Sequence, residues 1–163
     1  MIKTKKNLFL CVSLITLNVA FIWCNSLLSK ELSSAFSNLV GTVISWFFPA
    51  AQMQGGGAGH GTLRKIAHFM EFCSLGLLLS WLFHMTTQRK WTHYALPLVL
   101  GAAVACIDET IQIFVPGRGP GLRDVAIDSA GVLLGVLLLS WLAYRQQKKH
   151  EKAEQGGQDG QSV

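Results

Sequence analysis

Charged residues are scarce in this chain. Of its 163 residues, 14% are Asp, Glu, Lys or Arg and 50% are hydrophobic, and the mean hydropathy is +0.37. Soluble globular domains carry about 25% charged residues. The composition is therefore too apolar for an ordinary soluble domain, and the length allows one domain.

Several motifs that would direct the function are also lacking. The four cysteines, Cys11, Cys24, Cys73 and Cys106, show no Cys-x-x-Cys spacing, which argues against a cysteine metal site. All four fall in predicted helices, where they read as small buried hydrophobes. The glycine-rich run 55–59 lacks the Gly-Lys-Ser/Thr ending and the preceding strand of a phosphate loop. No serine or cysteine nucleophile with a neighbouring base is evident.

Four long apolar runs dominate the chain instead. They cover residues 8–28, 66–85, 94–115 and 125–144. Each is close to the roughly 20 residues that a helix needs to cross a bilayer. The first run is about twice as long as a signal-peptide core and has no clear Ala-x-Ala site after it, so we expect a retained anchor. The predicted fold class is an all-α membrane protein, a bundle of four transmembrane helices.

Two other segments complete the predicted organisation. Between the first two runs, apolar residues recur at i, i+3, i+4 and i+7, which predicts an amphipathic extracytoplasmic helix over residues 31–48. Residues 146–163 are rich in Gln, Lys, Gly and Glu and are predicted to form a disordered cytoplasmic tail. Residues 1–145 then form a single transmembrane domain.

The basic residues predict the orientation in the cell membrane. With four crossings, nine of the 14 Lys and Arg residues fall on the side of the two termini and five on the other side. Cytoplasmic loops carry the excess of Lys and Arg, so we expect both termini to be cytoplasmic. The net charge of +5 reflects this bias and requires no nucleic-acid partner.

Two adjacent carboxylic acids, Asp108 and Glu109, interrupt the third apolar run. A single Asp at the centre of a membrane helix costs roughly 2.5–3.5 kcal/mol on insertion scales. Such residues usually face a protein interior or a wet cavity and mark a functional site.

Other polar residues fall at the same predicted membrane face, at the start of the second run, the end of the third and the start of the fourth. Their spacings of three and four residues place them on shared helix faces. The catalytic candidates are Glu71, Asp108, Glu109 and Asp128. The ligand-binding candidates are Arg64, Lys65, His68, Gln112, Arg118, Arg123 and Asp124. Gly131 and Gly135 follow in a small-xxx-small pattern that lets helix backbones approach closely.

Four interpretations of this polar cluster stay open. A charge-balanced structural plug is one, although buried ion pairs often contribute little net stability. A pocket for an anionic headgroup is the second, with Arg118 and Arg123 as phosphate clamps. The third is an acid–base or metal-assisted enzyme, because close carboxylates share protons and carboxylates with a histidine hold divalent cations. A proton-coupled transporter is the fourth, although four helices leave little room for alternating access.

The order of these motifs resembles a known family. Residues 64–76 look like the signature R-K-x-x-H-F-x-E-Y-x-x-L-G of VanZ-like membrane proteins. Residues 108–118 and 123–135 look like that family's D-E-x-x-Q-x-F-x-P-x-R and x-D-x-x-x-N/D-x-x-G-x-x-x-G patterns. Two departures are visible, since Phe72 stands where Tyr is usual and Asp128 where Asn is usual.

The resemblance covers most of residues 20–140, including Asn25-Ser26 near the end of the first run. It implies a role at the cell envelope, because the family is named after a protein that gives low-level resistance to teicoplanin, a lipid-bearing glycopeptide. Glycopeptides act on cell-wall precursors outside the membrane, on the predicted side of the cluster.

The expected function is therefore that of an integral protein of the lipid bilayer that binds or modifies an amphiphilic cell-envelope molecule at an outward-facing acidic and basic pocket. A lipid-linked cell-wall precursor or a lipoglycopeptide fits that description, and with it a contribution to glycopeptide resistance. The alternatives are a non-catalytic scaffold or binding protein that limits antibiotic access, and a small proton-linked transporter. The pattern assigns no cofactor and leaves both binding and catalysis open.

Overall fold

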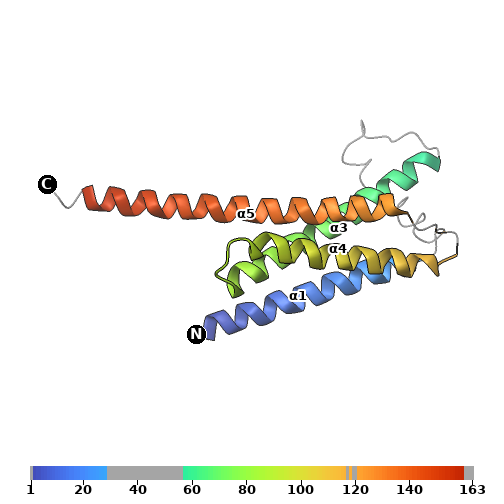
Figure 1. The fold of residues 1–163 in the computed structure, drawn as a ribbon, viewed down its shortest axis with the longest axis horizontal. Helices are drawn as coiled ribbons and strands as arrows, with labels where there is room; N and C mark the ends of the chain where they lie inside the picture. The colour runs from blue at the N-terminus through green and yellow to red at the C-terminus, as the bar shows by residue number, and fades with distance from the viewer. Residues whose placement is uncertain (1, 29–56, 117, 119–120, 160–163) are drawn as a thin grey trace, which may run out of the picture.

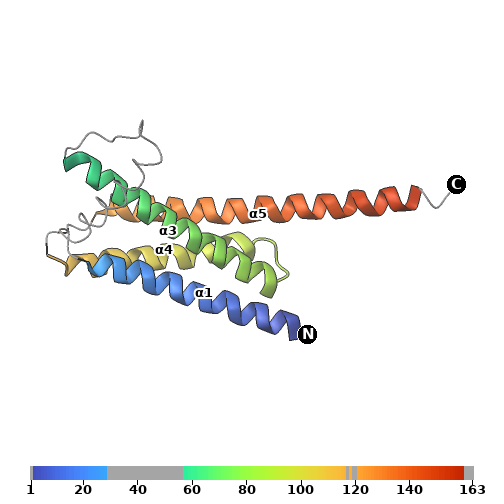
Figure 2. The same cartoon turned by 180° about the vertical axis from the view of Figure 1, so that it is seen from behind.

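A computed structural model describes residues 2–28, 57–116, 118 and 121–159 of the chain. Within these residues the only regular secondary structure is α-helix. The helices are α1 (Ile2–Leu27), α3 (Gly57–Thr86), α4 (Thr92–Ile113) and α5 (Leu122–Asp159). The helices pack side by side along their lengths into a bundle. α5 projects beyond one end of this bundle, and α1 starts at that same end (Figures 1 and 2).

Each helix contains a stretch long and apolar enough to cross a membrane. The stretches are Lys5–Leu27, Arg64–Thr86, Thr92–Ile113 and Leu122–Lys149. Only 11% to 39% of the most apolar part of each stretch is buried inside the bundle. Apolar side chains that face outward on every helix suit lipid rather than water, and helices satisfy their own backbone hydrogen bonds there. The chain is a multi-pass membrane protein, and the predicted four-helix class is confirmed.

The tightest packing in the bundle lies between α3 and α5. Phe72 and Leu75 of α3 and Val132 and Val136 of α5 are fully or almost fully buried in one core cluster. The cluster also contains Ile22 of α1, Leu79 of α3 and Ala105 of α4.

Two glycines of α5 allow this close approach. A Cβ atom at Gly131 would collide with the backbone carbonyl of Phe69, and one at Gly135 with that of Cys73. The two helix backbones therefore meet directly, which fixes the height of α3 relative to α5.

The C-terminal part of α5 differs from the sequence-based expectation. The prediction ended this helix at residue 144 and treated residues 146–163 as a disordered tail, but α5 continues to Asp159. Residues 145–155 are almost all Arg, Gln, Lys, Glu and Ala, which are good helix formers. The loss of hydropathy therefore ends the membrane span without ending the helix. The amphipathic helix predicted over residues 31–48 lies outside the described residues.

Candidate functional site

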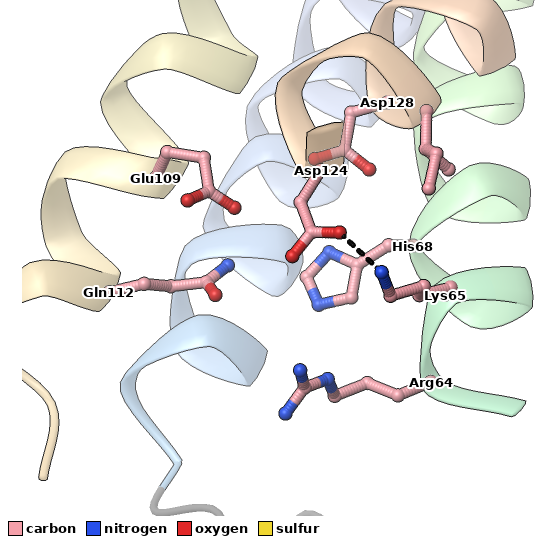
Figure 3. Close-up of a pocket in the computed structure, with 8 residues that line it drawn as sticks. Arg64, Lys65, His68, Glu109, Gln112, Asp124 and Asp128 are labelled. Atoms are coloured by element: carbon pink, nitrogen blue, oxygen red, sulfur yellow. Dashed lines mark ion pairs between the residues drawn. The ribbon is translucent and has the colours of Figure 1, made fainter. Parts of the chain in front are cut away.

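Polar side chains from α3, α4 and α5 converge on one pocket (Figure 3). This pocket is small and partly open to the outside of the bundle. Its lining consists of Arg64, Lys65 and His68 from α3, Glu109 and Gln112 from α4, and Asp124, Ile127 and Asp128 from α5. In Figure 3 the His68 ring points from α3 toward the carboxylates of α5, and the α4 side chains face both from across the pocket.

The helical period explains this convergence. Arg64 and His68 are one turn apart on α3, and Asp124 and Asp128 are one turn apart on α5. Residues at this spacing share a helix face. The start of α3, the end of α4 and the start of α5 lie at the same end of the bundle, so these faces meet (Figure 1).

The site is buried despite its polarity. His68, Asp108, Glu109, Gln112 and Asp128 are each at most 7% exposed. Burial of charged groups is costly unless they are paired or hydrogen-bonded. A cluster of this kind is tolerated where its members have partners, where its acids are neutral, or where a bound group completes it.

Hydrogen bonds fix the α4 residues of the site. Gln112 donates from Nε2 to Asp108 Oδ2 at 2.8 Å and to Ser26 Oγ of α1 at 3.2 Å. The backbone N–H of Gly121, immediately before α5, donates to Glu109 Oε2 at 3.0 Å. The end of α4 is thus tied to α1 on one side and to the start of α5 on the other.

One ion pair links α3 and α5 at the pocket. Lys65 Nζ lies 2.9 Å from Asp124 Oδ1, and the two side chains are 37% and 27% exposed (Figure 3). Pairs this accessible to solvent contribute about 0–1 kcal/mol to stability. The pair therefore contributes charge and shape to the pocket more than it stabilises the fold.

A second group of polar residues backs the pocket from the α1 side. Asn25 donates from Nδ2 to Glu71 Oε1 at 2.9 Å, and Arg118 donates to the Asn25 carbonyl at 3.3 Å. His68 Nδ1 lies between two carboxylates, 4.0 Å from Glu71 Oε2 and 3.9 Å from Asp108 Oδ2. Burial lowers the pKa of the Arg118 guanidinium, although arginine stays charged in proteins.

Several buried polar atoms of the site lack a hydrogen-bond partner among the described residues. They are His68 Nδ1, Glu71 Oε2, Asp108 Oδ1, Glu109 Oε1, and Nε and Nη1 of Arg118. The large majority of buried polar atoms in proteins are hydrogen-bonded, and leaving one unsatisfied costs about 1–3 kcal/mol. Acidic and basic side chains in and behind the pocket therefore both have atoms that make no hydrogen bond within the described residues.

Three of the buried residues have the chemistry of metal ligands. His68, Asp108 and Asp128 each offer one ligand atom, and the three atoms lie within 4.8 Å of one another.

The structure brings most of the residues predicted from the sequence into this region, with one exception. Arg123 is exposed on α5 and does not line the pocket. Three residues that were not among the predicted site residues take part: Ile127 in the lining, and Asn25 and Ser26 behind it. The consecutive polar residues Asn25 and Ser26 near the end of an apolar run were a usable signal, whereas Ile127 resembles any apolar helix residue.

The comparisons with known proteins agree with the motifs. The family described as VanZ/LLP1 matches residues 6–143. The chain belongs to the VanZ/LLP1 family. Neither the curated proteins nor the solved structures gave a match. The matched region contains every residue of the site, so the resemblance seen in the sequence is confirmed.

Proposed function

We propose that this VanZ/LLP1 protein binds, or binds and modifies, the anionic headgroup of an amphiphilic cell-envelope molecule in the pocket between α3, α4 and α5. One observation carries the proposal: buried groups of both charges, several with unused hydrogen-bonding atoms, converge on a pocket in a membrane bundle. A purely structural plug would be expected to satisfy those atoms internally.

The basic side chains of the pocket suit the phosphate or carboxylate part of a headgroup. Arg64 and Lys65 line the pocket. Two nitrogen atoms of Arg118, behind the pocket, have no hydrogen-bond partner within the part of the chain that the structure describes. Guanidinium groups bind such anions through two parallel charge-assisted hydrogen bonds. The nearby carboxylates would accept hydrogen bonds from hydroxyl or amide groups of the same headgroup.

The outer surface near the pocket suits the apolar part of such a molecule. Ile66, Met70 and Leu122 lie within a few residues of the pocket lining and are 47%, 59% and 91% exposed. A headgroup held by the polar side chains would leave its hydrocarbon chain against this surface and the surrounding lipid. An amphiphile therefore fits better than a small hydrophilic solute.

The proposed orientation places the pocket at the outer face of the membrane. The excess of Lys and Arg on the side of the termini favours a cytoplasmic position for both termini. The end of α4 and the start of α5, whose residues line the pocket, lie at the other end of the bundle (Figure 1). Ligands at that face include lipid-linked cell-wall precursors and lipoglycopeptides, which supports a contribution to teicoplanin resistance.

Glu109→Gln tests whether the carboxylates act chemically. The amide keeps the shape of the side chain and an oxygen for the Gly121 N–H, but it cannot transfer a proton as a carboxylic acid does. In a glycopeptide-sensitive host, we expect wild type to raise the inhibitory concentration of teicoplanin and Glu109→Gln to lose this effect. Lys148→Gln, on the exposed end of α5, is the matched control.

Membrane levels of all three proteins must be equal, and vancomycin serves as the lipid-free comparison drug. Full protection by Glu109→Gln would eliminate acid–base chemistry and leave a scaffold that limits antibiotic access. A correctly inserted wild type that gives no protection would remove glycopeptides from the proposal.

A further inference from the structure

We infer that His68, Asp108 and Asp128 form a binding site for one divalent metal ion of the Mn²⁺ or Zn²⁺ class. The three side chains come from α3, α4 and α5 and are 7%, 0% and 2% exposed. The inference goes beyond headgroup binding and does not depend on it, because it concerns the protein without any envelope ligand.

The geometry of the three side chains is close to that of a metal site. Their ligand atoms, one from each side chain, lie within 4.8 Å of one another. Ligand atoms about 2.1 Å from a common Zn²⁺ ion lie roughly 3.4 Å apart in a tetrahedral arrangement. Side-chain rotations that bring the atoms together by up to about 1.4 Å would therefore complete the site.

Unused hydrogen-bonding atoms give a second, independent indication. His68 Nδ1 and Asp108 Oδ1 are buried and have no hydrogen-bond partner among the described residues. Both belong to side chains that are more than nine-tenths buried, beside a pocket that His68 and Asp128 line. Gln112 meanwhile donates to Asp108 Oδ2 at 2.8 Å. Metal-binding carboxylates are commonly oriented by an outer partner of this kind.

The local charge also favours a cation. Acids outnumber basic residues in and behind the pocket: Glu71, Asp108, Glu109, Asp124 and Asp128 face Arg64, Lys65 and Arg118. Lys65 is already engaged with Asp124, and Arg118 lies on the α1 side, where it donates to Asn25. A divalent ion at the triad would compensate the remaining carboxylates at the point where they are most buried.

The donor set indicates the class of ion. Imidazole nitrogen suits Zn²⁺ and other first-row transition metals, whereas carboxylate oxygen suits Mn²⁺, Mg²⁺ and Ca²⁺. One nitrogen with two oxygens therefore fits Mn²⁺ or Zn²⁺ better than Ca²⁺. Three protein ligands leave a coordination position open, and His68 and Asp128 line the pocket toward which it would face.

The test measures the metal alone, in detergent and without envelope ligand. Protein purified through a histidine-free affinity tag and treated with chelator is titrated with Mn²⁺ by EPR and with Zn²⁺ by calorimetry. We expect one ion per chain. His68→Gln and Asp128→Asn should weaken binding by at least about 100-fold, because loss of outer-shell partners alone costs roughly 10–100-fold.

His84→Gln is the matched control. It removes an imidazole that stacks on His93 at the other end of α3, so it should leave the affinity unchanged. Thermal unfolding shows whether the variants fold. If they do not, pulsed EPR of Mn²⁺-loaded wild type still decides the question, because imidazole coordination gives a ¹⁴N coupling to the ion.

Three results would overturn the inference: no binding of either ion by wild type at millimolar concentration, a Mn²⁺ spectrum without ¹⁴N coupling, or equal binding by folded His68→Gln. None of them would bear on headgroup binding, which is measured separately with lipid.

Discussion

Gly135→Ala is expected to separate the two most closely packed helices. A methyl group at this position would collide with the Cys73 carbonyl and lie 2.7 Å from the Leu77 backbone nitrogen, where ordinary contacts begin at about 3.4 Å. Backbone atoms of α3 cannot rotate away as a side chain can. The contact is relieved only if α3 and α5 move apart by several tenths of an ångström.

The energetic cost follows from that displacement. Overpacking of a tight contact typically costs about 1–3 kcal/mol. Where the helices move apart, a gap of about 0.5–1 Å between neighbouring atoms removes roughly a quarter to a half of their dispersion energy. Alanine's higher helix propensity offsets up to about 1 kcal/mol. We expect a net loss of about 1–2 kcal/mol in the free energy of unfolding.

The assay is unfolding of the purified protein by SDS titration, followed by tryptophan fluorescence. Gly121→Ala is the control, because a methyl group there would lie 3.7 Å from Asp124 Oδ2, an ordinary contact. It should change the stability by less than about 0.5 kcal/mol. If Gly135→Ala were as stable as wild type and Gly121→Ala, the close approach of α3 and α5 would be refuted.

Three further predictions concern orientation, packing and charge. In a cysteine-free background, Leu122→Cys, at a position 91% exposed, should react with an impermeant maleimide in intact cells, and Lys148→Cys only after permeabilisation; the reverse result would invert the orientation. Asn18→Ala removes a 2.6 Å hydrogen bond to Ser74, so SDS titration should show a loss of about 0.5–1 kcal/mol; unchanged stability would contradict this contact. Lys65→Met should change stability by less than about 1 kcal/mol while weakening binding of anionic but not neutral lipid; equal binding of both would exclude a role for its charge.

The four membrane helices were predictable because apolar runs of bilayer length have few alternative structures. The ends of these helices were less predictable. The α5 extension beyond residue 144 carries no hydropathy signal, since a helix can continue into water once its residues become polar. Helix bounds read from hydropathy report the membrane span and not the whole helix.

The site was predictable as a region but not in its contacts. Helical spacing and alternating topology were enough to bring His68, Glu109 and Asp128 to one end of the bundle. The exposed position of Arg123 depends on the rotation of α5 about its axis. That rotation follows from the packing of Gly131 and Gly135 on α3, which a single sequence does not specify.

The most direct test of headgroup recognition is binding of a lipid-linked diphosphate to the purified protein in nanodiscs of neutral lipid. The same lipid without its phosphates serves as the matched ligand. Saturable binding of one diphosphate per chain is predicted. Arg64→Gln should weaken it about tenfold or more, because hydrogen bonds to charged groups contribute roughly 1.5–3 kcal/mol. Equal binding of the charged and uncharged lipids, or unchanged binding by Arg64→Gln, would contradict a pocket that recognises an anionic headgroup.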